Sequence, residues 1–292
     1  MTVVDVILAG CWRFYLSYGN GRQLAYMVPG GGLAAQYDNE GAWVRSYADV
    51  TAFWRLAQRY GRTEEARPYM EHALERYPSA SLQSRATRLS MIMAYRGMDA
   101  PDAVALRQHL RPVAPGIYDA CDLSFSNPQI VLALVQGGDR QAAREFVASA
   151  RRWIAHPLRR HGVFAANWVG RALTACQELV PELREPVANL TRAYVLPVLM
   201  SSRRASLTAD ACALTGLLAV ADVIAEDRDR IRQYVADRFA LIARHQRDDG
   251  GFPYHYDGTY VRTDVTTHVV EVALGLARLA SESARPPEPV NG

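Results

Sequence analysis

The sequence contains no lysine, so all 33 of its Lys and Arg residues are arginine. This absence excludes enzymes that form a Schiff base through a lysine, including pyridoxal-phosphate enzymes. It also excludes P-loop nucleotide binding, in which a lysine contacts the phosphates. Arginine can fill most surface roles of lysine, so the absence limits the chemistry and not the fold.

Cysteine is also scarce. The four cysteines, Cys11, Cys121, Cys176 and Cys212, lie far apart and form no Cys-x-x-Cys pair. A chain of 292 residues can bury a core without disulfide bonds. This cysteine pattern therefore favours a reducing environment, and we expect a cytoplasmic protein.

Long apolar runs and blocks of one charge are missing as well. The first apolar run, 3–8, is interrupted by Asp5 and is too short for a signal peptide or a membrane span. The formal net charge is only +3, and arginines alternate with acidic residues, as in 226–230. Such alternation is typical of solvated helix faces. We therefore expect no membrane span and no nucleic-acid partner.

What the sequence does have is helical periodicity along most of its length, in which apolar windows alternate with charged, amphipathic windows. The apolar windows are 46–60, 83–95, 124–137, 164–179, 207–223 and 263–280. The amphipathic windows are 2–18, 63–77, 102–110, 139–155, 183–201 and 227–247. Because the more apolar helices belong inside, the alternation predicts an all-α (α/α)6 toroid of six helical hairpins, with inner and outer helix rings.

This pattern predicts a single toroid domain over residues 1–280. The last segment, 281–292, is rich in Pro, Ser and Glu, and we expect it to be a disordered tail. Two long stretches without helical periodicity, 19–43 and 249–262, interrupt the pattern. Loops of this length in a compact domain are usually functional or disordered.

The starts of the inner helices predict a functional site, because in such a barrel their first turns converge on one bowl that carries partial positive charge. Two carboxylates on opposite walls can act as general acid and base, and we choose Asp49 and Asp264, with His268 as an alternative base. Aromatic rings and arginines at the same rim suit a carbohydrate, because rings stack on sugar faces and arginines bind hydroxyls or carboxylates. The predicted substrate-binding residues are Arg45, Tyr47, Arg85, Asn127, Asn167 and Trp168 at helix starts, and Tyr37, Asp38, Trp43, Tyr254 and Tyr256 in loops.

Other interpretations of these residues stay open. Asp, Ser, Thr and Asn begin helices as N-caps in many proteins, each contributing about 1 kcal/mol. Asp210, Cys212 and His268 have the right residue types for a three-ligand zinc site with an open position. Cys212 could equally be a small core residue in an apolar helix. Apart from this possible zinc ion, we expect no cofactor.

Two resemblances to known families bear on the choice between a carbohydrate site and a zinc site. The turn 246–252 (QRDDGGF) and the helix 268–276 resemble repeats of the terpene cyclase and protein prenyltransferase β-subunit superfamily. This resemblance implies the same fold and a zinc ion held by an Asp-x-Cys pair and a histidine, at the positions of Asp210, Cys212 and His268. The Asp-x-Asp-Asp motif of class II terpene cyclases is missing from the sequence.

The segment 46–54 (SYADVTAFW) is similar to a Ser-Tyr-Pro-Glu motif of toroidal proteins encoded with bacterial polysaccharide genes. Ala48 stands at the proline of that motif and Asp49 at the glutamate, while the helix 212–216 is similar to their Cys-x-x-Thr-Gly helix. The activity of those proteins is inferred from uronate epimerases, lyases and glycosidases of the same fold. The resemblance therefore implies a sugar or glycan substrate.

Together these features favour an enzyme that acts on a sugar or glycan through acid/base chemistry in the central bowl. Two alternatives remain. One is an isoprenoid cyclase or a zinc-dependent prenyl-transfer enzyme, and the other is a non-catalytic toroid that binds a glycan or a protein, because a fold alone does not establish activity.

Overall fold

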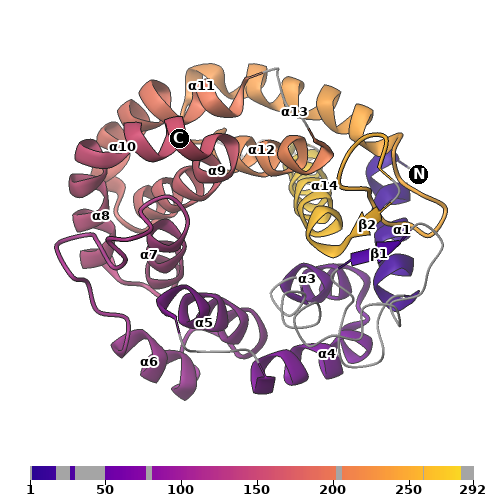
Figure 1. Cartoon of the computed structure of the whole chain (residues 1–292), viewed down its shortest axis with the longest axis horizontal. Coiled ribbons are helices and arrows are strands. Elements are labelled where there is room, and N and C mark those ends of the chain that lie inside the picture. Colours follow the sequence, from indigo (N-terminus) through magenta and orange to yellow (C-terminus); the bar gives the residue numbers. More distant parts are fainter. Residues whose placement is uncertain are drawn as a thin grey trace, which may run out of the picture.

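The chain forms a closed double ring of helices (Figure 1). The computed structural model describes residues 2–17, 27–29, 50–76, 81–201, 206–258 and 260–283. The inner ring consists of α3 (Val50–Tyr60), α5 (Leu82–Arg96), α7 (Ser126–Gln136), α9 (Ala155–Leu179), α12 (Leu207–Val220) and α14 (Thr263–Ser283). The outer ring consists of α1 (Val3–Ser17), α4 (Thr63–Arg76), α6 (Pro101–Gln108), α8 (Arg140–Trp153), α10 (Arg184–Leu190), α11 (Leu196–Leu199) and α13 (Arg228–Ala243). The predicted (α/α)6 toroid is confirmed.

The two rings differ in how much of each helix is buried. Outer helix α8 buries only one face, on which the apolar residues Ala143, Phe146 and Ala150 recur at helical spacing. Inner helix α12 is buried on almost every side, from Leu207 to Leu217. Burial of apolar area at roughly 25 cal/mol per Å² is the main favourable contribution to folding, so the ring is held together chiefly through the inner helices.

Polar residues set where several helices begin. The side chain of Asp139 accepts a hydrogen bond from the Ala142 amide at 2.9 Å at the start of α8. The Ser206 hydroxyl accepts one from the Ala209 amide at 3.2 Å at the start of α12. Each cap satisfies one of the amides that a first helical turn leaves without a partner.

Helix α1 closes the ring, because it packs against α3 of the first inner hairpin and against α13 and α14 of the last one. An aromatic cluster fixes it there. The ring of Phe53 in α3 lies 5.2 Å from Trp12, 5.0 Å from Tyr15 and 5.3 Å from Tyr69 of α4, measured between centroids. Such pairs contribute about 0.5–1.5 kcal/mol each beyond the area that they bury.

A short antiparallel pair of strands lies beside the start of the last inner helix. Strand β1 (Met27–Pro29) pairs with β2 (Tyr260–Arg262), and Met27 lies opposite Arg262. Because β2 leads directly into α14, the pair fixes the rim at which that helix begins (Figure 1).

The helices depart from the predicted windows in three places. The outer window 183–201 is divided into α10, a π-helical turn over Thr191–Val195, and α11. Helix α9 begins before the window at 164, and Gly162 interrupts it with a non-helical conformation. Helix α14 continues to Ser283, so 281–283 are helical, and the rest of the predicted tail lies outside the described residues. Across the part of the chain described here, none of the helices combines the length and hydropathy needed to cross a membrane.

Candidate functional site

Five inner helices line a central cavity of about 220 Å³. Its wall combines aromatic, charged and hydroxyl side chains. The lining residues are Thr51 and Arg55 of α3; Ala86, Thr87 and Ser90 of α5; Gln129, Leu132 and Gln136 of α7; Trp168 and Arg171 of α9; and Asp264, Thr267, His268 and Glu271 of α14. A concave pocket with a few convergent polar groups is the usual form of a small-molecule site.

Two further cavities adjoin this one along the ring. Their volumes are about 290 and 190 Å³, and Arg171 lines all three cavities. The second cavity also shares Arg55 and Glu271 with the first, while the third reaches Glu178 near the end of α9. The hollow therefore extends along the inner helices from their first turns to their last.

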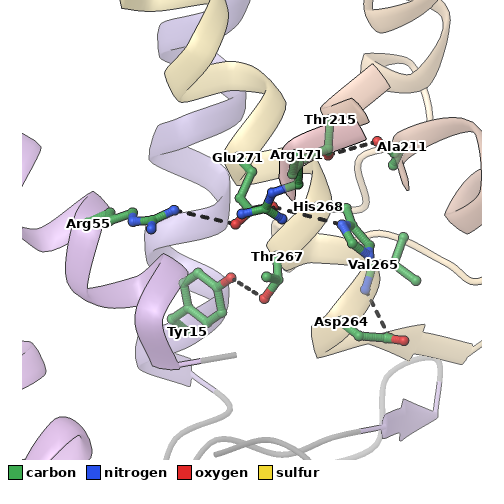
Figure 2. Close-up of polar contacts among 10 residues, drawn as sticks. All are labelled: Tyr15, Arg55, Arg171, Ala211, Thr215, Asp264, Val265, Thr267, His268 and Glu271. Carbon is green, nitrogen blue, oxygen red and sulfur yellow. Dashed lines mark hydrogen bonds and ion pairs between the residues drawn. The ribbon is translucent and has the colours of Figure 1, made fainter. Parts of the chain in front are cut away.

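Glu271 lies at the centre of the charged groups in this hollow (Figure 2). Its Oε1 is 3.4 Å from the Nη1 of Arg55, and its Oε2 is 3.4 Å from the Nη1 of Arg171. Burial alone would raise the pKa of Glu271, but Arg171, Arg55 and His268 together lower that pKa below its ordinary value. Glu271 is therefore an ionised carboxylate clamped by two helices.

His268 lies one turn before Glu271 on the same helix. Its Nδ1 is 4.0 Å from the Oε2 of Glu271. Burial lowers the pKa of His268, Glu271 and Asp264 oppose this effect, and Arg171 adds to it. Because the net direction is downward, the imidazole is neutral near neutral pH and can accept a proton.

Asp264 occupies the first turn of α14 and is held by the strand before it. Both oxygens of its carboxylate accept hydrogen bonds from the Arg262 guanidinium, at 2.9 and 2.5 Å. The guanidinium carbon of Arg262 in turn lies 4.5 Å from the centroid of the Tyr254 ring. Strand β2 thus places Arg262 so that it binds Asp264 at the rim of the cavity. Tyr254, predicted as a substrate-binding loop residue, supports this contact because its ring packs against Arg262.

Trp168 provides an aromatic wall, and the guanidinium of Arg171 lies 4.9 Å from the centroid of its ring. Thr267, on the side of α14 that faces Tyr15, shares a hydrogen bond of 3.1 Å with the Tyr15 hydroxyl of α1 (Figure 2). The cavity therefore presents a base, a carboxylate at the rim, two arginines and an aromatic ring.

Comparison with known proteins finds no family profile and no curated protein sequence that matches this chain. Solved structures do match. The fold is shared with sugar-acting toroids. An unsaturated glucuronyl hydrolase specific for heparin matches with a TM-score of 0.63 and 9% identity, over 96% of this chain and 97% of that one. An α-1,6-mannanase of Salegentibacter sp. HEL1_6, in an inactive variant with α-1,6-mannotriose, matches with a TM-score of 0.66 and 8% identity, over 95% and 98%.

A third match is a variant of UGL in complex with dGlcA-Glc-Rha-Glc, with a TM-score of 0.65 and 15% identity, over 94% of this chain and 96% of that one. At these identities the similarity establishes the (α/α)6 toroid and not the activity. The terpene cyclase resemblance is not reproduced among these matches, which are proteins that act on saccharides.

The structure does not bring the predicted zinc ligands together. Asp210 is buried and points toward the outer ring, where it accepts hydrogen bonds from Arg238 of α13, at 2.6 Å, and from the Tyr256 hydroxyl. Cys212 is buried within α12, and His268 lies on the cavity wall. No group of three His, Cys, Asp or Glu side chains in the described ranges has the arrangement of a metal site. The described residues therefore do not support the predicted zinc site, and the Asp210 carboxylate is bound by Arg238 and Tyr256 instead.

The two predicted asparagines are buried away from the cavity. Asn127 organises the loop before α7, because its Oδ1 accepts a hydrogen bond from the Tyr118 amide at 2.7 Å and its Nδ2 donates to the Gly116 carbonyl. Asn167 is fully buried, so neither side chain lines the cavity. Arg85 is half-buried on α5 and does not line the three cavities described above. These corrections leave Trp168, Asp264 and His268 on the wall.

Six other predicted site residues lie outside the described residues. They are Tyr37, Asp38, Trp43, Arg45, Tyr47 and Asp49. Their roles stay predictions from the sequence.

Arg55, Arg171 and Glu271 line the cavity but were not predicted from the sequence. Each lies beyond the first turn of its helix, and Arg171 lies in the second half of α9, whereas only the first turns were considered. A signal was available in α14, where Asp264, His268 and Glu271 repeat at intervals of four and three residues along an otherwise apolar helix. A polar stripe on an apolar inner helix indicates the side that faces a cavity.

Proposed function

We propose that this protein is an enzyme that acts on a sugar bearing a carboxylate, such as a uronic acid residue, through acid/base chemistry in the central cavity. The observation that carries the proposal is the cavity wall, which joins a neutral, half-buried histidine, a rim carboxylate, two arginines and a tryptophan. The shared fold with an unsaturated glucuronyl hydrolase and an α-1,6-mannanase supports a saccharide as the ligand.

The arginines favour a carboxylate on the substrate. Arg55 and Arg171 face one carboxylate between them, that of Glu271, so this part of the wall carries a net positive charge. An arginine has five N–H donors, and binding Glu271 leaves donors on both guanidinium groups for a ligand. Trp168 offers a ring on which a sugar face can stack. The cavity has the volume of roughly seven water molecules, at about 30 Å³ each, which is enough for one sugar ring.

The proton transfers fall to His268 and Asp264 in this proposal. A neutral imidazole can remove a proton from a carbon next to a carboxylate, from a hydroxyl or from a water molecule. Asp264 stands one turn away at the rim, where the Arg262 guanidinium holds it in place. Asp49 stays the predicted second carboxylate. In the sequence it precedes Thr51, which lines the cavity, by two positions.

A binding experiment tests the substrate class. Thermal unfolding should be measured with glucuronate, with glucose and with a prenyl diphosphate. We expect glucuronate to stabilise the protein, by about 2.7 kcal/mol at a hundred times its Kd, and glucose to do so much less. The Arg171→Gln variant should lose the preference for glucuronate, while Arg192→Gln, on the outer surface, should keep it. Stabilisation by the prenyl diphosphate alone would overturn the proposal.

Turnover of any sugar found in this way tests the assignment of residues. His268→Gln and Asp264→Asn should each lower kcat by about 10²-fold or more, which is the usual contribution of a general acid or base. Asp237→Asn, at an exposed position of outer helix α13, is the matched control and should leave kcat unchanged. Full activity in both cavity variants would show that the acid/base roles are wrong.

A further inference from the structure

His268 and Glu271 form a facing pair on α14 whose atoms lie just beyond hydrogen-bond distance. They lie three residues apart on the same side of α14, and the Nδ1 of His268 faces the Oε2 of Glu271 at 4.0 Å (Figure 2). That Nδ1 is buried and has no hydrogen-bond partner within the described chain. A buried ring nitrogen without a partner is costly, and the carboxylate is the acceptor that a small closing movement would supply.

Glu271 is fixed from two sides. Arg55, from α3, binds one carboxylate oxygen, and Arg171, from α9, binds the other. Arg171 is itself placed by its contact with the Trp168 ring. Because each oxygen is held by a different helix, rotation of the carboxylate would break both contacts. The plane of the carboxylate is therefore set by the ring of helices.

A carboxylate held in this way decides which nitrogen of a neutral imidazole carries the proton. A carboxylate accepts hydrogen bonds and cannot donate them when it is ionised. The stable arrangement places the proton on Nδ1, toward Glu271, and leaves Nε2 with a lone pair. His268 lines the cavity, so this lone pair is available to a ligand there.

We propose that Glu271 is a positioning residue for His268, which holds the proton on Nδ1 and so makes Nε2 the base that faces the cavity. This inference rests on the proposed function for the identity of the substrate, but not for the state of the histidine. In the reaction, a substrate O–H or C–H proton moves to Nε2, and its bonding electron pair stays on the substrate. The imidazolium that results is stabilised by the Glu271 carboxylate and later returns the proton. Glu271 itself gains no proton.

The charged groups around His268 have opposing effects. Glu271 and Asp264, both on α14, favour the protonated ring, whereas Arg171 of α9 disfavours it. Arg55 of α3 acts through Glu271, and the neutral Tyr15 of α1 contacts the neighbouring Thr267. Removing Glu271 and removing Arg171 should therefore shift the His268 pKa in opposite directions.

The test is a nitrogen NMR titration of the histidines, which needs no substrate. The chain has seven histidines, and the signal that disappears in His268→Gln identifies the residue. In the unmodified protein we expect the neutral His268 ring to be protonated on Nδ1. In Glu271→Gln the pKa of His268 should fall and the Nε2-protonated tautomer should appear. Glu271→Asp should restore part of the pKa and part of the Nδ1-protonated tautomer. In Arg171→Gln the pKa should rise.

The kinetic measurement adds a second readout. For a sugar that is turned over, Glu271→Gln should lower kcat by about 10²-fold and leave KM within a few-fold, because positioning acts on the proton-transfer step. Glu226→Gln, on the outer surface, is the control.

An Nε2-protonated His268 in the unmodified protein would overturn the inference, even if a variant failed to fold. An unchanged tautomer and pKa in a folded Glu271→Gln protein would do the same. If no sugar binds but the Nδ1 tautomer depends on Glu271, then the proposed function fails and the pairing stands.

Discussion

Single titratable residues in the cavity make the stability of the fold depend on pH. Burial places the pKa of folded His268 below the ordinary value of 6.5, so the unfolded chain takes up a proton first as the pH falls. The free energy of unfolding therefore decreases as the pH drops below that value. Glu271, with a lowered pKa, adds stability that is present above 4.5 and is lost below it. Both residues make acid destabilising.

The slope of that dependence should change when His268 is replaced. Replacing His268 by Gln removes one of the protons that the unfolded chain takes up, so the variant should lose less stability than the unmodified protein between about pH 7.5 and about pH 5. Urea unfolding at both pH values measures the difference. His109→Gln, at the exposed end of α6, serves as the control. Equal losses in the His268 variant and the unmodified protein would contradict the prediction.

Asp210, predicted as a possible metal ligand, binds an arginine and a tyrosine in the structure, and we expect its role to be structural. Its carboxylate is almost completely buried, and Arg238 and the Tyr256 hydroxyl bind it. The Arg238 side chain is only partly exposed, so replacing Asp210 by Asn would leave its charge without a carboxylate in a place that water reaches poorly. We expect a loss of about 2–4 kcal/mol in the free energy of unfolding, equal with and without added zinc. Asp237→Asn on the same outer helix should cost far less, and a loss that appears only with zinc would favour a metal site after all.

At the scale of elements, the joint between α1 and the turn after α13 closes the ring. The Gln246 side chain donates hydrogen bonds to the Ile7 carbonyl at 3.0 Å and to the Gly250 carbonyl at 2.9 Å. Gly250 has a positive φ of 89°, and a Cβ there would lie 2.0 Å from the Gly10 carbonyl oxygen. The turn thus needs glycine for its conformation and also for its close approach to α1.

A pair of alanine variants separates these two requirements. Gly138 has a φ of 91° but open space around it, so Gly138→Ala should cost about 1–2 kcal/mol from conformation alone. Gly250→Ala adds a collision with the backbone of α1 and should cost at least roughly twice as much. Equal melting temperatures for the two variants would show that α1 is not held by this turn.

Most helices could be predicted from the sequence because their apolar periodicity is strong. The outer window 183–201 is an exception, because it was expected to form one helix. There the chain forms short α-helices around a π-helical turn, and the sequence pattern does not distinguish a broken helix from a continuous one. The orientation of α12 was also hidden. A helix that is apolar on nearly all sides has no polar face to set its rotation, so Asp210 was interpreted as a possible zinc ligand although it binds Arg238 of α13.

At the scale of the whole molecule, the toroid brings Trp168, Asp264 and His268 to one cavity, although of the three only Asp264 lies in the first turn of its helix. The Glu271 cluster could not be predicted in the same way, because it joins α3, α9 and α14. Which distant residues meet across a ring depends on its diameter and on the rotation of each helix, and helical periodicity specifies neither.

The closure of the ring by α1 also bears on how the protein is made. Tyr15 contacts Thr267, 252 positions later in the chain, and the Trp12 side chain belongs to the same buried joint. During synthesis on the ribosome, the apolar side of α1 therefore emerges long before α14 can cover it. Contacts between such distant segments form late and leave apolar surface exposed meanwhile. The apolar side of α1 consequently stays uncovered by its own chain until the last hairpin has been translated.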